Sequence, residues 1–399
     1  MSAKELKTAL SLALVFFLRM LPLFMVLPVL SLSEDSYTHA TPQLLGLALG
    51  VYGITQAGLQ IPFGALSDRW GRKPMIVLGL IIFGVGSLIA ATADSVYGLI
   101  IGRLLQGAGA VAAAIMALAA DLTNEESRTK AMACIGVSIG AAFCLAFILG
   151  PILYTYIGIK GLFYLSACFS ILAIIVLLII VPNPEKKSQN INPFNLEVIK
   201  SVFVNPTLIK LDISIFSSHL ILMANFVVIP ITLRDSMHLA PITHWQVYLS
   251  AIFLSLFIMV PCIIFGERLN KEKLFLILSI ILIMFSQIGL ALFALDLNFF
   301  VIFLVLFFGP FNYLEALLPS EVSKTTLEHT KGTALGVYST SQFIGIFIGG
   351  LAGGFFCQQF GLISVHLFCL FITIFWLLLM LFLTKNESLG KNQLEEESV

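Results

Sequence analysis

The sequence predicts an all-α membrane protein of twelve transmembrane helices, arranged as two pseudo-symmetric bundles of six. Three observations support this class. Only 11% of the 399 residues are charged and 59% are apolar, whereas a soluble domain carries about 25% charged residues. The apolar residues fall into runs of about 20, the length that a spanning helix needs. The second half of the chain also repeats short motifs of the first half.

The apolar runs predict the membrane spans directly. In chain order they are Leu10–Leu30, Gln43–Phe63, Met75–Ala93, Tyr97–Ala120, Ala131–Leu153, Gly161–Val181, Leu211–Leu233, Trp245–Phe265, Leu274–Ala294, Phe299–Pro319, Thr333–Phe356 and Ile363–Leu383. The first run lacks a small-residue cleavage site after it, so we expect a retained helix and not a signal peptide.

The basic residues predict the orientation. With both termini on the cytoplasmic side, 18 of the 22 Lys and Arg residues fall in cytoplasmic segments. Only Lys160 and Arg234 lie in the outer loops, and Arg19 and Arg103 lie within spans. This asymmetry is the positive-inside rule. It predicts a multi-pass protein of a bacterial inner membrane with both termini cytoplasmic.

The polar segments predict the domain organisation. Residues 1–181 form the first six-helix bundle, 182–206 a cytoplasmic linker rich in Asn, Lys and Pro, and 207–384 the second bundle. Residues 385–399 are short and polar and are expected to be a disordered cytoplasmic tail.

The two halves match at an offset of about 200 residues. Pro62 lies six residues before Asp68, and Pro261 lies six residues before Glu267. "TKAMACIG" from Thr129 has a counterpart, "TKGTALG", from Thr330. Several matches in the same order predict tandem halves around a central cavity.

Two motifs carry a family resemblance. The loop after the second span reads "GALSDRWGRKPMI", residues 64–76, and the fourth span contains "RLLQGAGA", residues 103–110. Both resemble the major facilitator superfamily, and the resemblance extends over the whole chain. Within it, the sequence is most similar to the YajR-like, drug-efflux group. Proteins of that type carry an extra soluble C-terminal domain, which we do not expect here because the chain ends soon after the last span.

The resemblance implies a conformational latch at the cytoplasmic surface. Asp68 and Arg72 are four residues apart, so they can face each other over one helical turn. In the family they pair with an acid at the end of the fourth span, a place that Asp121 occupies here. The expected latch residues are Gly64, Asp68, Arg69, Gly71, Arg72 and Asp121. For Arg69, a purely topogenic charge is an equal alternative.

Four ionisable residues within spans are functional candidates, because charge in the hydrocarbon region is costly. They are Arg19, Arg103, His219 and Glu315. Arg19 can attract a substrate anion or bond to carbonyl groups for packing. Arg103 matches the family's arginine that is linked to proton coupling, or it extends to the interface.

Glu315 is the only acid well within a span, and a carboxyl group in such a place can exchange protons near neutral pH. A structural role is the alternative. His219 is either a hydrogen-bonded packing residue or a second proton carrier. The Gly150-Pro151 pair resembles the core of the antiporter motif of the fifth span, where it would serve helix packing. Ala146 departs from that motif, which expects glycine.

These features predict a secondary active transporter that exports small organic or drug-like compounds by alternating access, coupled to protons. A carrier for one metabolite or siderophore is the alternative, and a membrane sensor on the same scaffold is a third. No nucleophile–base pair, nucleotide loop or metal-ligand spacing predicts an enzyme, a metal or a cofactor. The expected partners are a small-molecule substrate, protons and the lipid bilayer, without nucleic acid, for a monomeric protein.

Overall fold

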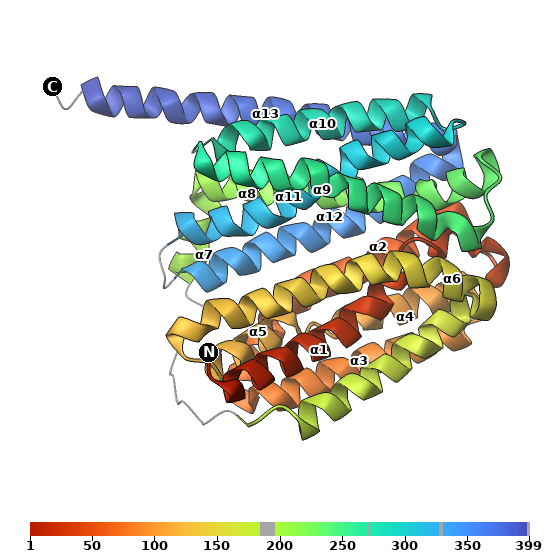
Figure 1. The fold of residues 1–399 in the computed structure, drawn as a ribbon, viewed down its shortest axis with the longest axis horizontal. Coiled ribbons are helices and arrows are strands. Elements are labelled where there is room, and N and C mark those ends of the chain that lie inside the picture. Colours follow the sequence, from red (N-terminus) through yellow and green to blue (C-terminus); the bar gives the residue numbers. More distant parts are fainter. Residues whose placement is uncertain (184–195, 270, 327–329, 397–399) are drawn as a thin grey trace.

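A computed structural model describes residues 1–399 apart from 184–195, 270, 327–329 and 397–399. The described chain is almost entirely helical (Figure 1). The helices of the first half are α1 (Ala3–Met25), α2 (Pro42–Trp70), α3 (Arg72–Thr92), α4 (Val96–Ala108), α5 (Ala112–Asp121) and α6 (Glu125–Ile179). Those of the remainder are α7 (Leu196–Val204), α8 (Pro206–Ile231), α9 (His244–Arg268), α10 (Glu272–Leu292), α11 (Leu297–Thr325), α12 (Lys331–Phe360) and α13 (Leu362–Glu396).

Eleven helical segments among the described residues are long and apolar enough to span a membrane. One of them, α6, holds two helices, because Gly158 adopts a non-helical conformation with φ 66° and ψ −179°. The chain reverses there, as Figure 1 shows. A continuous helix of 55 residues would measure about 80 Å, far more than the hydrocarbon core of about 30 Å. The predicted fold class, with its twelve spans, is thereby confirmed.

The fourth predicted span differs from the expectation of one continuous helix. It consists of α4 and α5, separated at residues 109–111. The break follows from close packing: a Cβ on Gly109 would lie 2.3 Å from the backbone oxygen of Gly79 in α3. A hydropathy pattern cannot register this break, because the residues that surround it remain apolar.

Helix ends follow ordinary capping chemistry. The Thr41 hydroxyl accepts a hydrogen bond from the Leu44 amide at 3.3 Å, and Pro42 fills the first turn of α2. Asn205 and Asp296 cap α8 and α11 in the same manner. These caps satisfy amide groups that a helix start otherwise leaves unpaired.

The helices α1–α6 pack together as one half, and α8–α13 pack together as the other (Figure 1). Within the predicted linker, residues 196–204 form α7, which contacts α8 and α12. The helix α13 runs past the predicted end of the last span at Leu383, and its bounds extend to Glu396. The disorder expected for residues 385–399 and the exact domain limits stay predictions.

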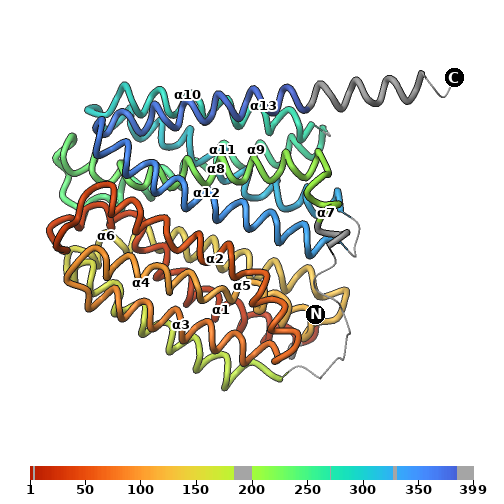
Figure 2. The backbone as a smooth tube through the Cα atoms, turned by 180° about the vertical axis from the view of Figure 1, so that it is seen from behind, coloured from red at the N-terminus to blue at the C-terminus, as the bar shows by residue number. Residues whose placement is uncertain are grey.

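The loops lie at two ends of the molecule. We call the end that holds Arg72, Asp121 and Asn124 the basic end; it also holds the N-terminus and α7 (Figure 2). The other end, which we call the far end, holds the loops around Thr38, Asp94 and Lys160. The sequence predicts that the basic end is cytoplasmic.

Candidate functional site

Arg72 ties three helices together at the basic end. Its guanidinium pairs with Asp68, one turn back on α2, and its Nε lies 3.1 Å from Asp121 Oδ2 at the end of α5. Its Nη1 donates to the Ser67 hydroxyl at 2.7 Å. A planar fork with several donors suits such multiple acceptors. The structure therefore brings together the three charged residues on which the predicted latch depends.

The glycines of this loop contribute unequally. Gly71 has φ +99°, a backbone conformation that side chains other than glycine rarely adopt, and it lets α2 end one residue before α3 begins. Gly64 is less constrained, since a Cβ there would meet Ala113 only at an ordinary 3.6 Å. Its carbonyl accepts from the Ser67 hydroxyl at 2.6 Å. Arg69 is exposed and has no ion-pair partner among the described residues.

Two contacts at the basic end were not expected from the sequence. The Glu5 carboxylate accepts hydrogen bonds from the Ser2 amide at 2.7 Å and the Asn124 amide at 3.0 Å. Lys73 donates to the backbone oxygen of Val181. The Ser2-x-x-Glu5 pattern of a capping box was a usable signal for the first of these. Together they fasten α1 and α3 to the two ends of α6.

Arg19 is buried in the first half, with 1% of its surface exposed. Its Nη2 donates to the Gly109 carbonyl at 2.7 Å and to Gln56 Oε1 at 3.4 Å, and the guanidinium lies 5.7 Å from the Phe83 ring centre. Arg19 Nε and Gln56 Nε2 have no partner among the described residues. This geometry supports the packing alternative, because the guanidinium stabilises the break between α4 and α5.

Arg103 does not extend to the interface. It is fully buried, donates to the Ala48 and Leu49 carbonyls at 3.0 and 3.2 Å, and reaches Gln106 Oε1 at 2.7 Å. Its guanidinium lies 4.5 Å from the centre of the Tyr52 ring, a cation–π distance. The alternative of snorkelling to the membrane surface is therefore wrong for Arg103.

The second half contains a polar cluster that three helices build. His219 of α8 lies with Nδ1 3.6 Å from Glu315 Oε1 of α11. Its Nε2 lies 2.8 Å from Gln342 Nε2 of α12. Tyr338, one turn before Gln342, is close enough to interact electrostatically with Glu315 and with Asp212 of α8. We call these five residues the acid–histidine cluster.

Glu315 has fewer hydrogen bonds than either His219 or Gln342 in the described part of the chain. Its Oε1 has no hydrogen-bond partner among the described residues, and the 3.6 Å to His219 exceeds a hydrogen bond. The sequence identified Glu315 and His219 as candidates, and the structure places them side by side. It did not identify Gln342 or Tyr338, because a single polar residue in a helix gives no indication of its tertiary partner.

The halves meet toward the far end. Phe147 of α6 packs against three aromatic rings of the second half, with ring centres 5.2 Å away at Phe226, 5.1 Å at Tyr248 and 6.4 Å at Phe308. All four side chains are buried. We call this group the aromatic plug. The sequence could not predict this group, because the chain has many phenylalanines and any of them can equally face lipid.

Small residues bring α2 and α12 into backbone contact beside the plug. A Cβ on Gly46 would lie 2.5 Å from the Gly350 carbonyl, and one on Gly50 would lie 2.8 Å from the Ile346 carbonyl. The Gln43 amide also donates to Gln358 Oε1 at 3.1 Å. Gly150, which precedes Pro151 inside α6, allows the same close approach within the first half. A Cβ on Gly150 would lie 2.6 Å from the Met25 carbonyl oxygen.

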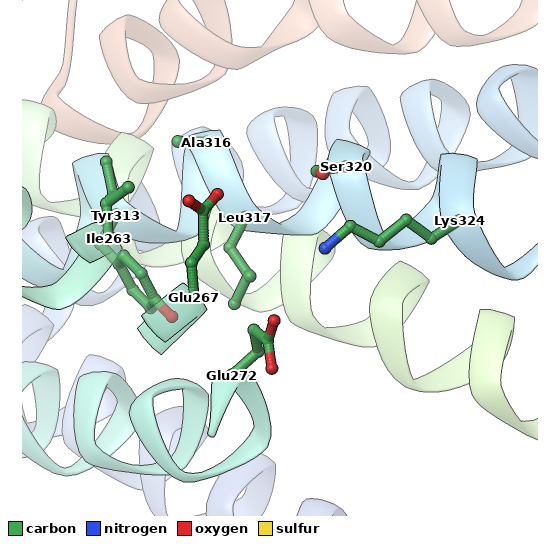
Figure 3. Close-up of a pocket in the computed structure, with 8 residues that line it drawn as sticks. All are labelled: Ile263, Glu267, Glu272, Tyr313, Ala316, Leu317, Ser320 and Lys324. Carbon is green, nitrogen blue, oxygen red and sulfur yellow. The ribbon is translucent and has the colours of Figure 1, made fainter. Parts of the chain in front are cut away.

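The repeated loop of the second half forms a small pocket at the basic end (Figure 3). Glu267 and Glu272 converge on it, and Lys324 pairs with Glu321 at 2.9 Å. Lys324 and Glu321 both lie on α11, so their ion pair does not connect a second helix as the Arg72 contacts do. Nor do three His, Cys, Asp or Glu side chains gather among the described residues in a way that could hold a metal ion.

Twelve membrane-length helices in two packed halves, with ionisable groups buried in each, define a polytopic membrane transporter. The chain belongs to the Major Facilitator Superfamily, whose family profile matches residues 12–323 and 316–398. It is 43% identical over 378 residues to the inner membrane transport protein YajR of Escherichia coli, covering 94% of this chain and 83% of that protein.

Two further similarities bear on fold and family. The multidrug resistance protein MdtH of Aeromonas salmonicida is 25% identical over 86% of this chain and 84% of its own. The crystal structure of a bacterial homologue of the human lysosomal transporter Spinster, in an inward-facing and occupied conformation, matches with a TM-score of 0.80 at 13% identity. That match covers 96% of this chain and 98% of the other, and it shows the shared fold.

Proposed function

We propose that this transporter exports small organic or drug-like compounds in exchange for protons, with Glu315 as the group that binds the coupling proton. The observation that carries the proposal is the carboxyl group of Glu315, which lies among helices α8, α11 and α12 without a bonded counter-charge. The Oε1 atom is buried, while the side chain as a whole keeps 36% of its surface exposed. When the cavity closes to water, the carboxylate loses this hydration, so the group then favours taking a proton.

Two observations support the proposed substrate class. Relatives of the chain include a multidrug resistance protein, and the described interior is lined mostly by apolar and aromatic side chains. Such surfaces accept varied apolar solutes. Export from the cytoplasm is the direction that this likeness favours, and the basic end is then the side from which substrate enters.

The test uses purified protein in proteoliposomes with an imposed pH gradient and a panel of labelled apolar, zwitterionic and siderophore-like solutes. Glu315→Gln keeps shape and hydrogen bonding but fixes the neutral form. We expect it to abolish gradient-driven accumulation while it spares substrate binding and gradient-free exchange. Glu321→Gln, which removes a carboxylate on the same helix outside the acid–histidine cluster, is the matched control.

Accumulation by Glu315→Gln with the wild-type pH dependence would show that the proton site lies elsewhere. Transport of one metabolite or siderophore alone would favour the specific carrier, and no transport of any solute by wild-type protein would favour the sensor.

A further inference from the structure

Gln342 occupies an unusual place in the fold. It lies on α12, the helix that packs against α8 of its own half and α2 of the other. The next residue, Phe343, packs closely on α2: a Cβ on Gly53 would lie only 2.5 Å from the Phe343 carbonyl oxygen. One side of this short segment therefore contacts the first half, while Gln342 reaches His219 in the second.

The ring of His219 has a defined hydrogen-bond pattern. Its Nδ1 lies 3.3 Å from the Ile215 carbonyl, which can only accept, so Nδ1 carries a hydrogen. In the neutral ring, Nε2 then has a lone pair, and it accepts from Gln342 Nε2 at 2.8 Å. Both ring nitrogens of the neutral form are satisfied, which leaves Glu315 beside the ring without a bond.

A primary amide can serve both charge states of the ring. If His219 gains a proton, Nε2 becomes a donor and needs an acceptor. Gln342 supplies one when its amide turns by about half a rotation, so that Oε1 faces the ring. A buried side chain that only donates or only accepts would leave one of the two states with an unpaired polar group, which is costly.

We propose that Gln342 is the positioning residue of proton coupling, whose amide reverses as the shared proton moves between Glu315 and His219. With the proton on the carboxyl group, the ring is neutral and Gln342 donates to it. The proton that leaves Glu315 cannot go to Nδ1, which already carries the hydrogen that faces Ile215, so it reaches Nε2 through the water to which the Glu315 side chain is 36% exposed. Glu315 and His219 then form an ion pair across the 3.6 Å between Oε1 and Nδ1, and Gln342 accepts from Nε2. The inference rests on the proposed proton coupling at Glu315.

Among the described residues, Tyr338 from α12 interacts electrostatically with Glu315, and Asp212 from α8 interacts with Tyr338. Both are unchanged in the variants below, so a difference between variants reports on position 342. Because Gln342 sits where α12 contacts α2, the reversal of its amide couples the proton to the helix that joins the halves.

The experiment replaces Gln342 by residues of similar length. Gln342→Glu can only accept when ionised, and Gln342→Met can neither donate nor accept. The glutamate favours the proton-loaded pair, so the pH midpoint of gradient-driven transport should rise by about one unit. The methionine leaves Nε2 unpaired in both states, but the charged ring loses the stronger hydrogen bond, so the midpoint should fall by about one unit.

Gln358→Glu makes the same chemical change on the same helix at the far end, and it should keep the wild-type profile. The fall in Gln342→Met decides, because a carboxylate at position 342 raises the midpoint by its charge alone, whereas a residue that only packs has no reason to lower the midpoint when methionine replaces it. A rise or no shift in Gln342→Met overturns the inference. If Gln342→Met does not fold, Gln342→Leu, which also lacks a donor and an acceptor, takes its place.

The wild-type protein and Glu315→Gln are measured in parallel. Loss of accumulation in Glu315→Gln with unshifted profiles at position 342 rejects the role of Gln342 and leaves the proposed function intact. Normal accumulation in Glu315→Gln rejects the proposed function itself.

Discussion

At the scale of single residues, Arg19 and Arg103 are almost fully buried in the first half, with no carboxylate in ion-pair contact among the described residues. Carbonyl oxygens and aromatic rings take the place of counter-ions. Only a guanidinium can do this at Arg103, because its donors diverge toward Ala48, Leu49 and Gln106 at once. The residue is therefore a brace between α4 and α2.

Arg103→Lys tests the brace. A lysine keeps the charge but can reach only part of the acceptor set, so one or two hydrogen bonds to a charged group are lost, at about 1.5–3 kcal/mol each. We expect the melting temperature of the detergent-solubilised protein to fall by on the order of 5 °C. Arg69→Lys, at an exposed position, should leave it unchanged. Equal melting temperatures for the two variants would contradict the brace.

At the scale of elements, the contacts of Arg72 at the basic end connect α2, α3 and α5. Asp68 and Asp121 hold Arg72 from two sides, while Gly71 allows the tight turn between α2 and α3. Since side chains of the latch are partly exposed, each ion pair contributes modestly. Their effect lies in geometry, because one rigid fork fixes the relative position of three helix ends.

Asp68→Asn should slow transport about fivefold and leave membrane insertion and protein yield unchanged. The substitution removes one of the two ion pairs of Arg72, while the pair with Asp121 remains. Initial transport rates in proteoliposomes measure this. Arg69→Gln removes a charge from the same loop without touching the latch and should transport at the wild-type rate. If both variants are equally slow, the loop acts through net charge alone.

Much of this element-level picture could be predicted. The spans followed from runs of about 20 apolar residues, and the Asp68–Arg72 pair followed from helical spacing. The break at Gly109 could not be predicted, because it results from contact with Gly79. The partners of His219 were hidden for the same reason: hydropathy reports burial in lipid but carries no information on which helix face meets which neighbour.

At the scale of the whole molecule, the orientation in the membrane is still a prediction. The Lys and Arg asymmetry places the basic end, with both termini, in the cytoplasm. Fusions of alkaline phosphatase and of green fluorescent protein at the C-terminus and within residues 182–206 measure it. We expect fluorescence and no phosphatase activity at both sites. Phosphatase activity at either one would contradict the orientation and the direction of transport proposed from it.

Alternating access requires that the contacts between the halves at the far end separate. In this structure those contacts include the aromatic plug around Phe147, the glycine contact of α2 with α12, and a hydrogen bond from the Ser31 hydroxyl to the Phe226 carbonyl at 3.4 Å. The structure thus represents a state closed at the far end. Because one ring of the first half contacts three rings of the second, Phe147 contributes most to the plug.

Phe147→Ala should therefore shift the protein toward the state that is open at the far end. Three aromatic contacts of about 0.5–1.5 kcal/mol each are lost with the ring, which corresponds to at least about a tenfold change in the equilibrium.

The reporter is Asn225→Cys in a background without the native cysteines, since Asn225 is buried beside Phe226. A membrane-impermeant thiol reagent added from the far side should label this cysteine about ten times faster in the Phe147→Ala protein. Phe163→Ala removes an equally buried ring from within the first half and should not change the rate. Equal labelling in the two variants would mean that the glycine contact between α2 and α12, and not the plug, holds the far end closed.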